Sequence, residues 1–176
     1  MIPNSGPAEP IAARSPRSKQ ENVNSILEFL HQLPKDLPRG RSDSEWTKLI
    51  KQRFSDLGRL NGCDICPEES SSQWLCDLVW YREENEAVVE VPLALESEWN
   101  PSWRSIRYDF EKLLAVKAGI KVMIFQDYED NLPELWSKLE HGIGTFRRDE
   151  EAETYILAAF REVPHLFEIR VIPPTA

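Results

Sequence analysis

The sequence predicts an α/β protein with a single domain, in which helices flank one central mixed sheet. Its 176 residues match the usual size of one domain. Hydrophobic residues make up 41% of the chain, enough for a core that needs no disulfide or metal to fold. Their spacing switches between the helical and the strand period, in the order helix, strand, strand, helix, strand, helix. An α+β sandwich of another kind is the alternative that this order leaves open.

The first twenty residues predict a disordered basic tail. They hold four prolines, few large apolar side chains, and three basic residues against one acidic residue. Because such a segment cannot offset the entropy lost on ordering, we expect the folded domain to span 21–176.

Two helices are expected after the tail. Apolar residues at helical spacing predict the first over 21–33, and Pro34 and Pro38 should end it. The second begins near 42–44, where Ser and Asp side chains can cap the free amides, and ends at Gly58.

An antiparallel hairpin is expected next. The strand 73–82 is rich in Trp, Leu, Val and Tyr, a polar turn covers 83–86, and a second strand covers 87–99. Apolar and polar residues alternate over 89–95, which places the apolar ones on one face. Pro92 cannot donate a hydrogen bond to a sheet, so we expect an edge or a bulge there.

The rest of the chain predicts helices over 105–118 and 132–139, with a short strand over 121–125 between them. That strand is nearly all apolar, which is typical of a strand covered on both faces. Two final strands are expected over 154–160 and 166–172, although the first of them fits a helix equally well.

The net charge of −9 argues against a protein that coats nucleic acid or anionic membranes by bulk charge. The tail contributes +2, which leaves −11 for the domain. No apolar run approaches the ~20 residues of a membrane helix, and the first twenty residues lack the apolar core of a secretory signal. Three cysteines, an odd number, fit a reducing compartment, so we expect a cytoplasmic protein that does not engage membranes.

Three carboxylates stand out from the hairpin pattern. In an extended strand Asp77 shares a face with apolar side chains, which is costly unless its charge is paired or hydrogen-bonded. Glu96 and Glu98 lie two residues apart, point the same way and repel each other unless a cation lies between them. The alternative is structural: an Asp that accepts backbone amides, and a solvated Glu pair.

The hairpin brings these carboxylates near one another only with an irregularity. If the strands pair around the turn at 83–86, Asp77 faces roughly residue 92, a few residues short of Glu96. A bulge at Pro92 or a splayed pair would bring Asp77 and Glu96 together.

The segment over about 42–126 resembles the core of the PD-(D/E)XK nuclease-like superfamily. The resemblance is carried by Asp77-Leu-Val-Trp, the strand end Glu96-Ser-Glu-Trp, the helix Asp109-Phe-Glu-Lys-Leu-Leu and the strand Lys121-Val-Met-Ile-Phe. It implies a restriction-endonuclease-like core, in which an acidic residue opens one strand and an (Asp/Glu)-x-Lys motif closes the next.

The resemblance also implies a set of site residues. Asp77 and Glu96 match the two acids and would hold Mg²⁺ or Mn²⁺, and Glu45 is the candidate for a further acid from the preceding helix. Glu98 stands where the family has Lys, as in some restriction endonucleases of the superfamily that use Glu-x-Glu. Glu98 would then accept a proton or help to hold a second ion. Cys76 also replaces the expected Pro before Asp77.

Basic residues of the following helix complete the expected site. Lys112 is a candidate replacement for the missing Lys as a phosphate contact, although a surface lysine beside Glu111 explains it as well. Arg104, Arg107 and Trp103 are candidate nucleic-acid contacts in the one basic stretch after residue 60.

Two functions follow from these residues. The first is a divergent Mg²⁺-dependent nuclease that hydrolyses phosphodiester bonds of DNA or RNA. The alternative is a catalytically inactive, acidic protein-binding module that acts as an immunity factor, an inhibitor or a nucleic-acid mimic.

Overall fold

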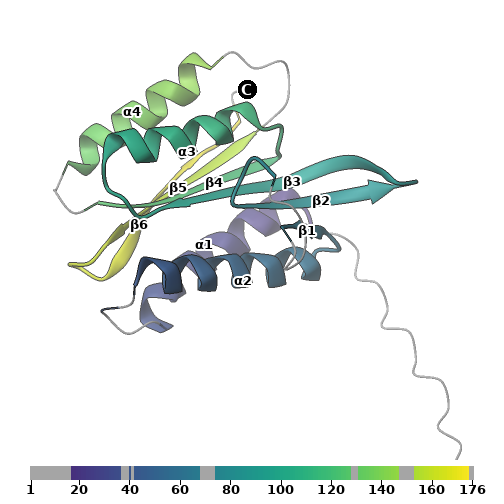
Figure 1. Ribbon diagram of the computed structural model, residues 1–176, viewed down its shortest axis with the longest axis horizontal. Helices are drawn as coiled ribbons and strands as arrows, with labels where there is room; N and C mark the ends of the chain where they lie inside the picture. Colours follow the sequence, from purple (N-terminus) through teal and green to yellow (C-terminus); the bar gives the residue numbers. More distant parts are fainter. Residues whose placement is uncertain are drawn as a thin grey trace, which may run out of the picture.

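The computed structural model describes residues 17–36, 40, 42–67, 74–127, 131–146 and 153–174. The strands of this part form one mixed sheet in the order β1-β2-β3-β4-β5-β6, with four helices packed on it (Figure 1). The elements are α1 (Lys19–Asp36), α2 (Asp43–Leu60), β1 (Asp64–Cys66), β2 (Leu78–Glu84), β3 (Ala87–Glu98), α3 (Trp103–Ala115), β4 (Ile120–Gln126), α4 (Leu132–Thr145), β5 (Thr154–Arg161) and β6 (Leu166–Ile172).

Strand direction divides the sheet into a parallel centre and antiparallel edges. β3, β4 and β5 are parallel neighbours, whereas β1, β2 and β6 pair antiparallel. The α3 and α4 connections each lead from one parallel strand to the next, which covers the central strands on one face. β4 is buried along its whole length, as its apolar sequence predicts.

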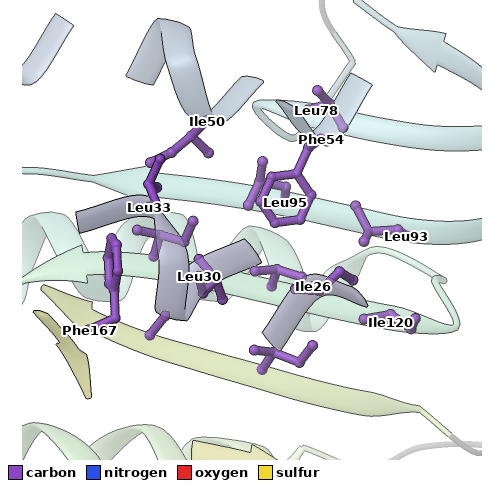
Figure 2. Packing of buried hydrophobic residues seen from close by; sticks show 14 of the residues in the cluster. Ile26, Leu30, Leu33, Ile50, Phe54, Leu78, Leu93, Leu95, Ile120 and Phe167 are labelled. Atoms are coloured by element: carbon purple, nitrogen blue, oxygen red, sulfur yellow. The ribbon is translucent and has the colours of Figure 1, made fainter. Parts of the chain in front are cut away.

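The sheet separates two hydrophobic cores. α1 and α2 lie on one face and α3 and α4 on the other (Figure 1). In the first core, Ile26 and Leu30 of α1 and Phe54 of α2 pack over Leu93 and Leu95 of β3 (Figure 2). Burial of these side chains fixes both helices to the strand that carries the candidate acids.

The β2–β3 hairpin turns tightly and contains two bulges. Its turn is Asn85–Glu86, both with positive φ (52° and 63°), as in the two-residue turns that suit twisted hairpins. Glu84 pairs with Ala87 beside the turn and Leu78 pairs with Leu95 at the far end. Six steps along β2 therefore span eight steps along β3, because the register shifts twice between them.

One of these shifts lies at Pro92, where a bulge is predicted. Trp80 pairs with Leu93 and Arg82 with Glu90, so Val91 and Pro92 both lie opposite Tyr81. The bulge also breaks the predicted alternation of faces, since Val91 packs against the α3–α4 core rather than the core of Leu93. The predicted bulge at Pro92 is confirmed, and the predicted single apolar face over 89–95 is wrong.

The predicted fold class is confirmed as a single α/β domain with a mixed sheet and flanking helices. β3 and β6 lie where strands are expected, and 154–160 is a strand rather than a helix. β1 was not predicted, because three residues are too few to show a period. Within the described residues no helix is long and apolar enough to cross a membrane.

Two predicted helix ends are wrong. Pro34 lies inside α1, where its missing N–H costs one backbone bond in the last turn. Gly58 lies inside α2 rather than after it, because the helix approaches the sheet there. A Cβ on Gly58 would lie 2.5 Å from Cδ1 of Ile65 and 2.7 Å from Nε1 of Trp80.

The boundary of the tail also moves. α1 begins at Lys19, inside the range 1–20 that the sequence assigns to the tail. The predicted disorder of 1–16 lies outside the described residues.

The packing of α3 generates the first prediction. Phe110 is 2% exposed in the α3–α4 core, whereas Tyr108 on the same helix is 68% exposed. Phe110→Ala should lower the free energy of unfolding by about 3–5 kcal/mol, because it leaves a cavity. Tyr108→Ala should change it by less than about 0.5 kcal/mol. Urea denaturation of both variants tests this, and equal losses would contradict the assignment of the buried face.

Candidate functional site

The two hairpin bulges place Asp77 and Glu96 side by side. The sequence places Asp77 within an expected strand over 73–82. In the structure β2 begins at Leu78, and Asp77 directly precedes it. Because Leu78 pairs with Leu95, the next positions along the two chains are Asp77 and Glu96. The Asp77 N–H donates to Oε1 of Glu96 at 3.2 Å, so the predicted proximity of the two acids is observed.

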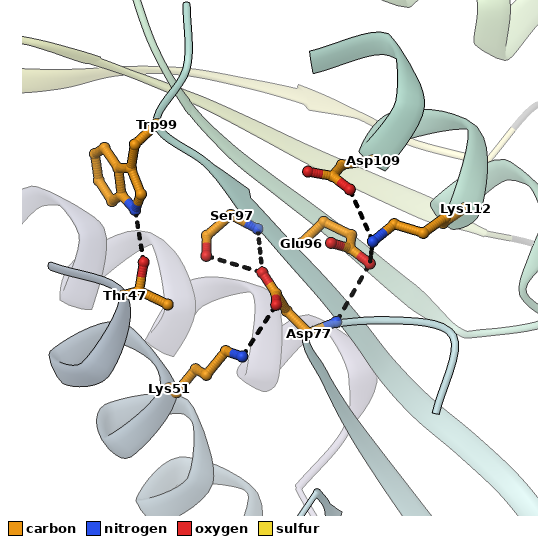
Figure 3. Close-up of polar contacts among 8 residues, drawn as sticks. All are labelled: Thr47, Lys51, Asp77, Glu96, Ser97, Trp99, Asp109 and Lys112. Carbon is orange, nitrogen blue, oxygen red and sulfur yellow. Dashed lines mark hydrogen bonds and ion pairs between the residues drawn. The ribbon is translucent and has the colours of Figure 1, made fainter. Parts of the chain in front are cut away.

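The Asp77 carboxylate is held by three donors. Its Oδ2 accepts both the Ser97 N–H and the Ser97 hydroxyl at 3.0 Å (Figure 3). Its Oδ1 forms an ion pair with Nζ of Lys51, on α2, at 3.0 Å. Nearby, Nε1 of Trp99 donates to Oγ1 of Thr47 at 2.8 Å. These contacts attach α2 to the end of β3.

The Glu96 carboxylate turns toward α3 instead (Figure 3). It is 1% exposed and forms an ion pair with Nζ of Lys112 at 2.8 Å, which also pairs with Asp109 at 2.7 Å. Burial, together with the charges of Asp77 and Asp109, raises the pKa of Glu96 to about 7, although the hydrogen bond and charge of Lys112 oppose this rise. Glu96 is therefore a carboxyl group that exchanges protons near neutral pH.

Lys112 keeps its charge in this setting. Burial lowers the pKa of Lys112, but its hydrogen bonds to Asp109 and Glu96 outweigh burial and raise it overall. Because Lys112 has two carboxylate partners, Asp109 keeps the ammonium ionised even when Glu96 is protonated. Its side chain is 19% exposed, so Lys112 is a member of the site and not the surface lysine of the alternative interpretation.

Glu98 lies at the more open end of the site. Its Oε1 accepts the Asn100 N–H at 2.7 Å, and burial raises its pKa, with a further increase from Asp109. Beside it, on the N-terminal half of α3, is a groove of about 550 Å³. The groove is lined by Glu98, Trp103, Arg104, Ser105, Arg107, Tyr108 and Glu111. The three predicted nucleic-acid contacts therefore share one groove with a predicted acid.

Glu45 lies elsewhere. Its carboxylate accepts the Ser42 N–H at 3.0 Å and the Ser42 hydroxyl at 2.9 Å, which forms the capping box of α2. α2 instead contributes Lys51 to the site, and α3 contributes Asp109. Neither residue stands out in the sequence, although Asp109 and Lys112 lie three apart on a helix and form a recognisable pair.

The ionised side chains of the site carry a net negative charge that a cation would offset. Four carboxylates face two lysines, a net charge of about −2 when all are ionised, which matches one divalent cation. The carboxylates are Asp77, Glu96, Glu98 and Asp109, and the lysines are Lys51 and Lys112.

The donor set has the ligand type that magnesium takes, but its carboxylates are not arranged around one position. Mg²⁺ takes oxygen ligands and usually binds one or two carboxylates, with waters and substrate phosphates completing its shell. Within the described residues no group of three or more His, Cys, Asp or Glu is placed to hold a metal ion. Asp77 and Glu96 are the adjacent pair, but their carboxylates face different helical layers, each on a lysine (Figure 3). Joint ligation therefore requires one lysine contact to open.

Comparison of the chain with protein-family models, curated proteins and solved structures finds no significant match. The resemblance to the PD-(D/E)XK nuclease-like superfamily therefore stays a prediction from the sequence.

The buried Glu96 generates a pH prediction for the metal-free protein. Its pKa is about 7 when folded against a usual 4.5, so the folded state binds the proton more tightly. This stabilisation is complete below pH 4.5 and is lost as the pH rises through about 7. It amounts to at most roughly 3 kcal/mol. The free energy of unfolding, measured in urea with EDTA, should therefore fall between pH 5 and pH 8.

Glu96→Gln should remove most of this pH dependence, because glutamine does not titrate. Glu83→Gln, at an exposed hairpin position, is the matched control and should leave it unchanged. If Glu96→Gln kept the full pH dependence of the free energy of unfolding, groups other than Glu96 would be its cause.

Proposed function

We propose that the protein is a divalent-cation-dependent, nuclease-like enzyme that hydrolyses phosphodiester bonds of DNA or RNA. The observation that carries this proposal is the position of Lys112. The superfamily pattern has a Lys two residues after the second acid, where this chain has Glu98. α3 supplies a lysine from the other direction, with Nζ 2.8 Å from the Glu96 carboxylate. Two acids and a lysine therefore lie next to one another in space, although the linear motif lacks its lysine.

The order of the elements supports the proposal. α2 precedes β2, which begins directly after Asp77, and β3 ends with Glu96 and Glu98. α3 follows, and β4 then lies parallel to β3. A helix and a further strand after the second acid are what the resemblance implies.

The chain's own residues divide the work as follows. Lys112 is placed to contact a phosphate oxygen and to offset the charge that develops on it. Glu98, the acid nearest the groove, is placed to accept a proton from the attacking water. Arg104 and Arg107 would hold the flanking nucleic-acid backbone.

Asp77 and Glu96 would hold the cation. When bound, magnesium supplies electrostatic stabilisation to the phosphate under attack. Joint ligation by Asp77 and Glu96 would require Lys51 or Lys112 to leave its carboxylate, and a released Lys112 would be free to contact the substrate.

A second function, an inactive protein-binding module, is favoured by one observation. Asp77 is already satisfied by Ser97 and Lys51, and Glu96 is already paired with Lys112. Such a network braces α2 and α3 against the sheet without any ligand. The acidic surface would then face a basic partner.

A metal titration separates these two functions. Mn²⁺ should raise the melting temperature of the wild type. At a hundredfold excess over its dissociation constant, Mn²⁺ should add about 2.7 kcal/mol to the free energy of unfolding. Asp77→Asn should lose most of this gain. In EDTA the variant should be destabilised by about 1–3 kcal/mol, because the acceptor of Ser97 and partner of Lys51 is weakened.

Asp64→Asn, at an exposed position of β1, is the matched control and should keep the full Mn²⁺ response. If the wild type shows no Mn²⁺ response and cleaves neither DNA nor RNA, the nuclease proposal fails and the binding module remains.

Lys112 generates the activity prediction. Lys112→Met keeps much of the side-chain length without the charge and should lower the cleavage rate by about 10²–10³-fold, as loss of a transition-state donor does. Lys35→Met, which removes an exposed lysine in the last turn of α1, should leave the rate within about twofold. Single-turnover cleavage with Mn²⁺ is the measurement. Equal rates in both variants would exclude Lys112 from the chemistry.

A further inference from the structure

Tyr108 is an exposed aromatic side chain beside the site, and neither the fold nor the proposed chemistry accounts for it. It is 68% exposed, more than any other aromatic side chain among the described residues. The buried face of α3 is made by Ile106, Phe110 and Leu113, so Tyr108 adds nothing to the core. An exposed ring that lines a groove beside the site is available to stack on a ligand.

The ring flanks the lysine of the site. Nζ of Lys112 lies 5.6 Å from the centroid of the Tyr108 ring and 2.8 Å from the Glu96 carboxylate. A phosphate held by Lys112 would therefore have Tyr108 as its immediate neighbour on the outer surface of α3.

Tyr108 also lines the groove of about 550 Å³, together with Arg104, Arg107 and the carboxylates of Glu98 and Glu111. Arg104 has no ion-pair or hydrogen-bond partner among the described residues, whereas Arg107 pairs with Glu111 at 2.6 Å. Arg104 is one turn before Tyr108 and Lys112 one turn after it, so the ring lies between two cations along α3. Alternation of cations with an exposed ring is the arrangement that binds single-stranded nucleic acid.

We infer that the site acts on single-stranded nucleic acid, with Tyr108 as the platform for an unpaired base next to the scissile phosphate. This inference rests on the proposed nuclease function and names its substrate class. In a duplex both faces of each base are occupied by its neighbours, so Tyr108 has no face to stack on. An unpaired base offers that face, and Arg104 and Lys112 then contact the phosphates on either side of it.

Binding without cleavage tests the inference directly. The full-length protein is titrated, in EDTA, into fluorescent oligothymidylate of about twelve nucleotides and into a duplex of equal length, with fluorescence anisotropy as the readout. The single strand should bind more tightly. Tyr108→Ala should weaken its binding by about 5–150-fold, the equivalent of 1–3 kcal/mol for one stacked base, with little effect on the duplex.

Three further variants identify the contact. Tyr108→Phe keeps the ring and should bind like the wild type. Phe146→Ala removes an exposed aromatic at the end of α4, outside the groove, and should have no effect. Arg104→Ala should weaken binding to the single strand and reduce its salt dependence, because one phosphate contact is lost.

The outcomes separate the inference from the proposed function. Equal binding of both oligonucleotides with no effect of Tyr108→Ala, or no binding of either, would overturn the inference; cleavage in Mn²⁺ would then still decide the nuclease proposal. Tyr108-dependent binding of the single strand without cleavage in Mn²⁺ would overturn the nuclease proposal and leave a single-strand binding groove.

Discussion

The pairing register of β2 with β3 is the constraint on which the rest of the site depends. Without its two bulges, Asp77 would lie opposite a residue two positions away from Glu96. The irregularities cost ladder hydrogen bonds on the turn side of the hairpin, one at the buried Pro92 and one at the exposed Val89. In return two acids become neighbours at the end of the sheet, where α2 and α3 both reach them. The irregular pairing therefore lies between Trp80 and Glu83, and the pairing next to the site, over Leu78–Trp80, is regular.

Once the two acids are neighbours, their charges determine which side chains must surround them. A buried carboxylate such as Glu96 is tolerated only with a charged partner or with its proton. The structure supplies Lys51 from one helical layer and Lys112 from the other, so each acid is neutralised from a different side. The same residues therefore suit two arrangements. With both lysines in place, every carboxylate has a partner and no ligand is needed; a cation site would require Lys51 or Lys112 to leave its carboxylate.

The fold was more predictable from the sequence than the site. Strong periodicity over β3, β4 and α3 reveals whether each is a helix or a strand, whereas β1 is too short to show a pattern. The sequence around Gly58 predicts the end of a helix, but in the structure Gly58 is the point where α2 packs closely on the sheet. Asp77 and Glu96 stand out because carboxylates are unusual in such strands. Lys51 and Tyr108 do not, since lysine and tyrosine on an exposed helical face are ordinary. The contact of Lys51 with Asp77 depends on the register of two distant strands, which the local sequence does not encode.

α3 joins the core, the acids and the groove in one element. Its inner face, with Ile106 and Phe110, anchors it to β4 and α4, so the helix cannot rotate without opening the core. That rigidity fixes where Lys112 and Tyr108 point, one toward Glu96 and the other into the groove. Positions three and four apart on a helix share a face, so a single helical stripe carries the cations and the ring together. A nucleic-acid strand lying along α3 would therefore meet Arg104, Tyr108 and Lys112 in sequence, with Glu98 beside it in the groove.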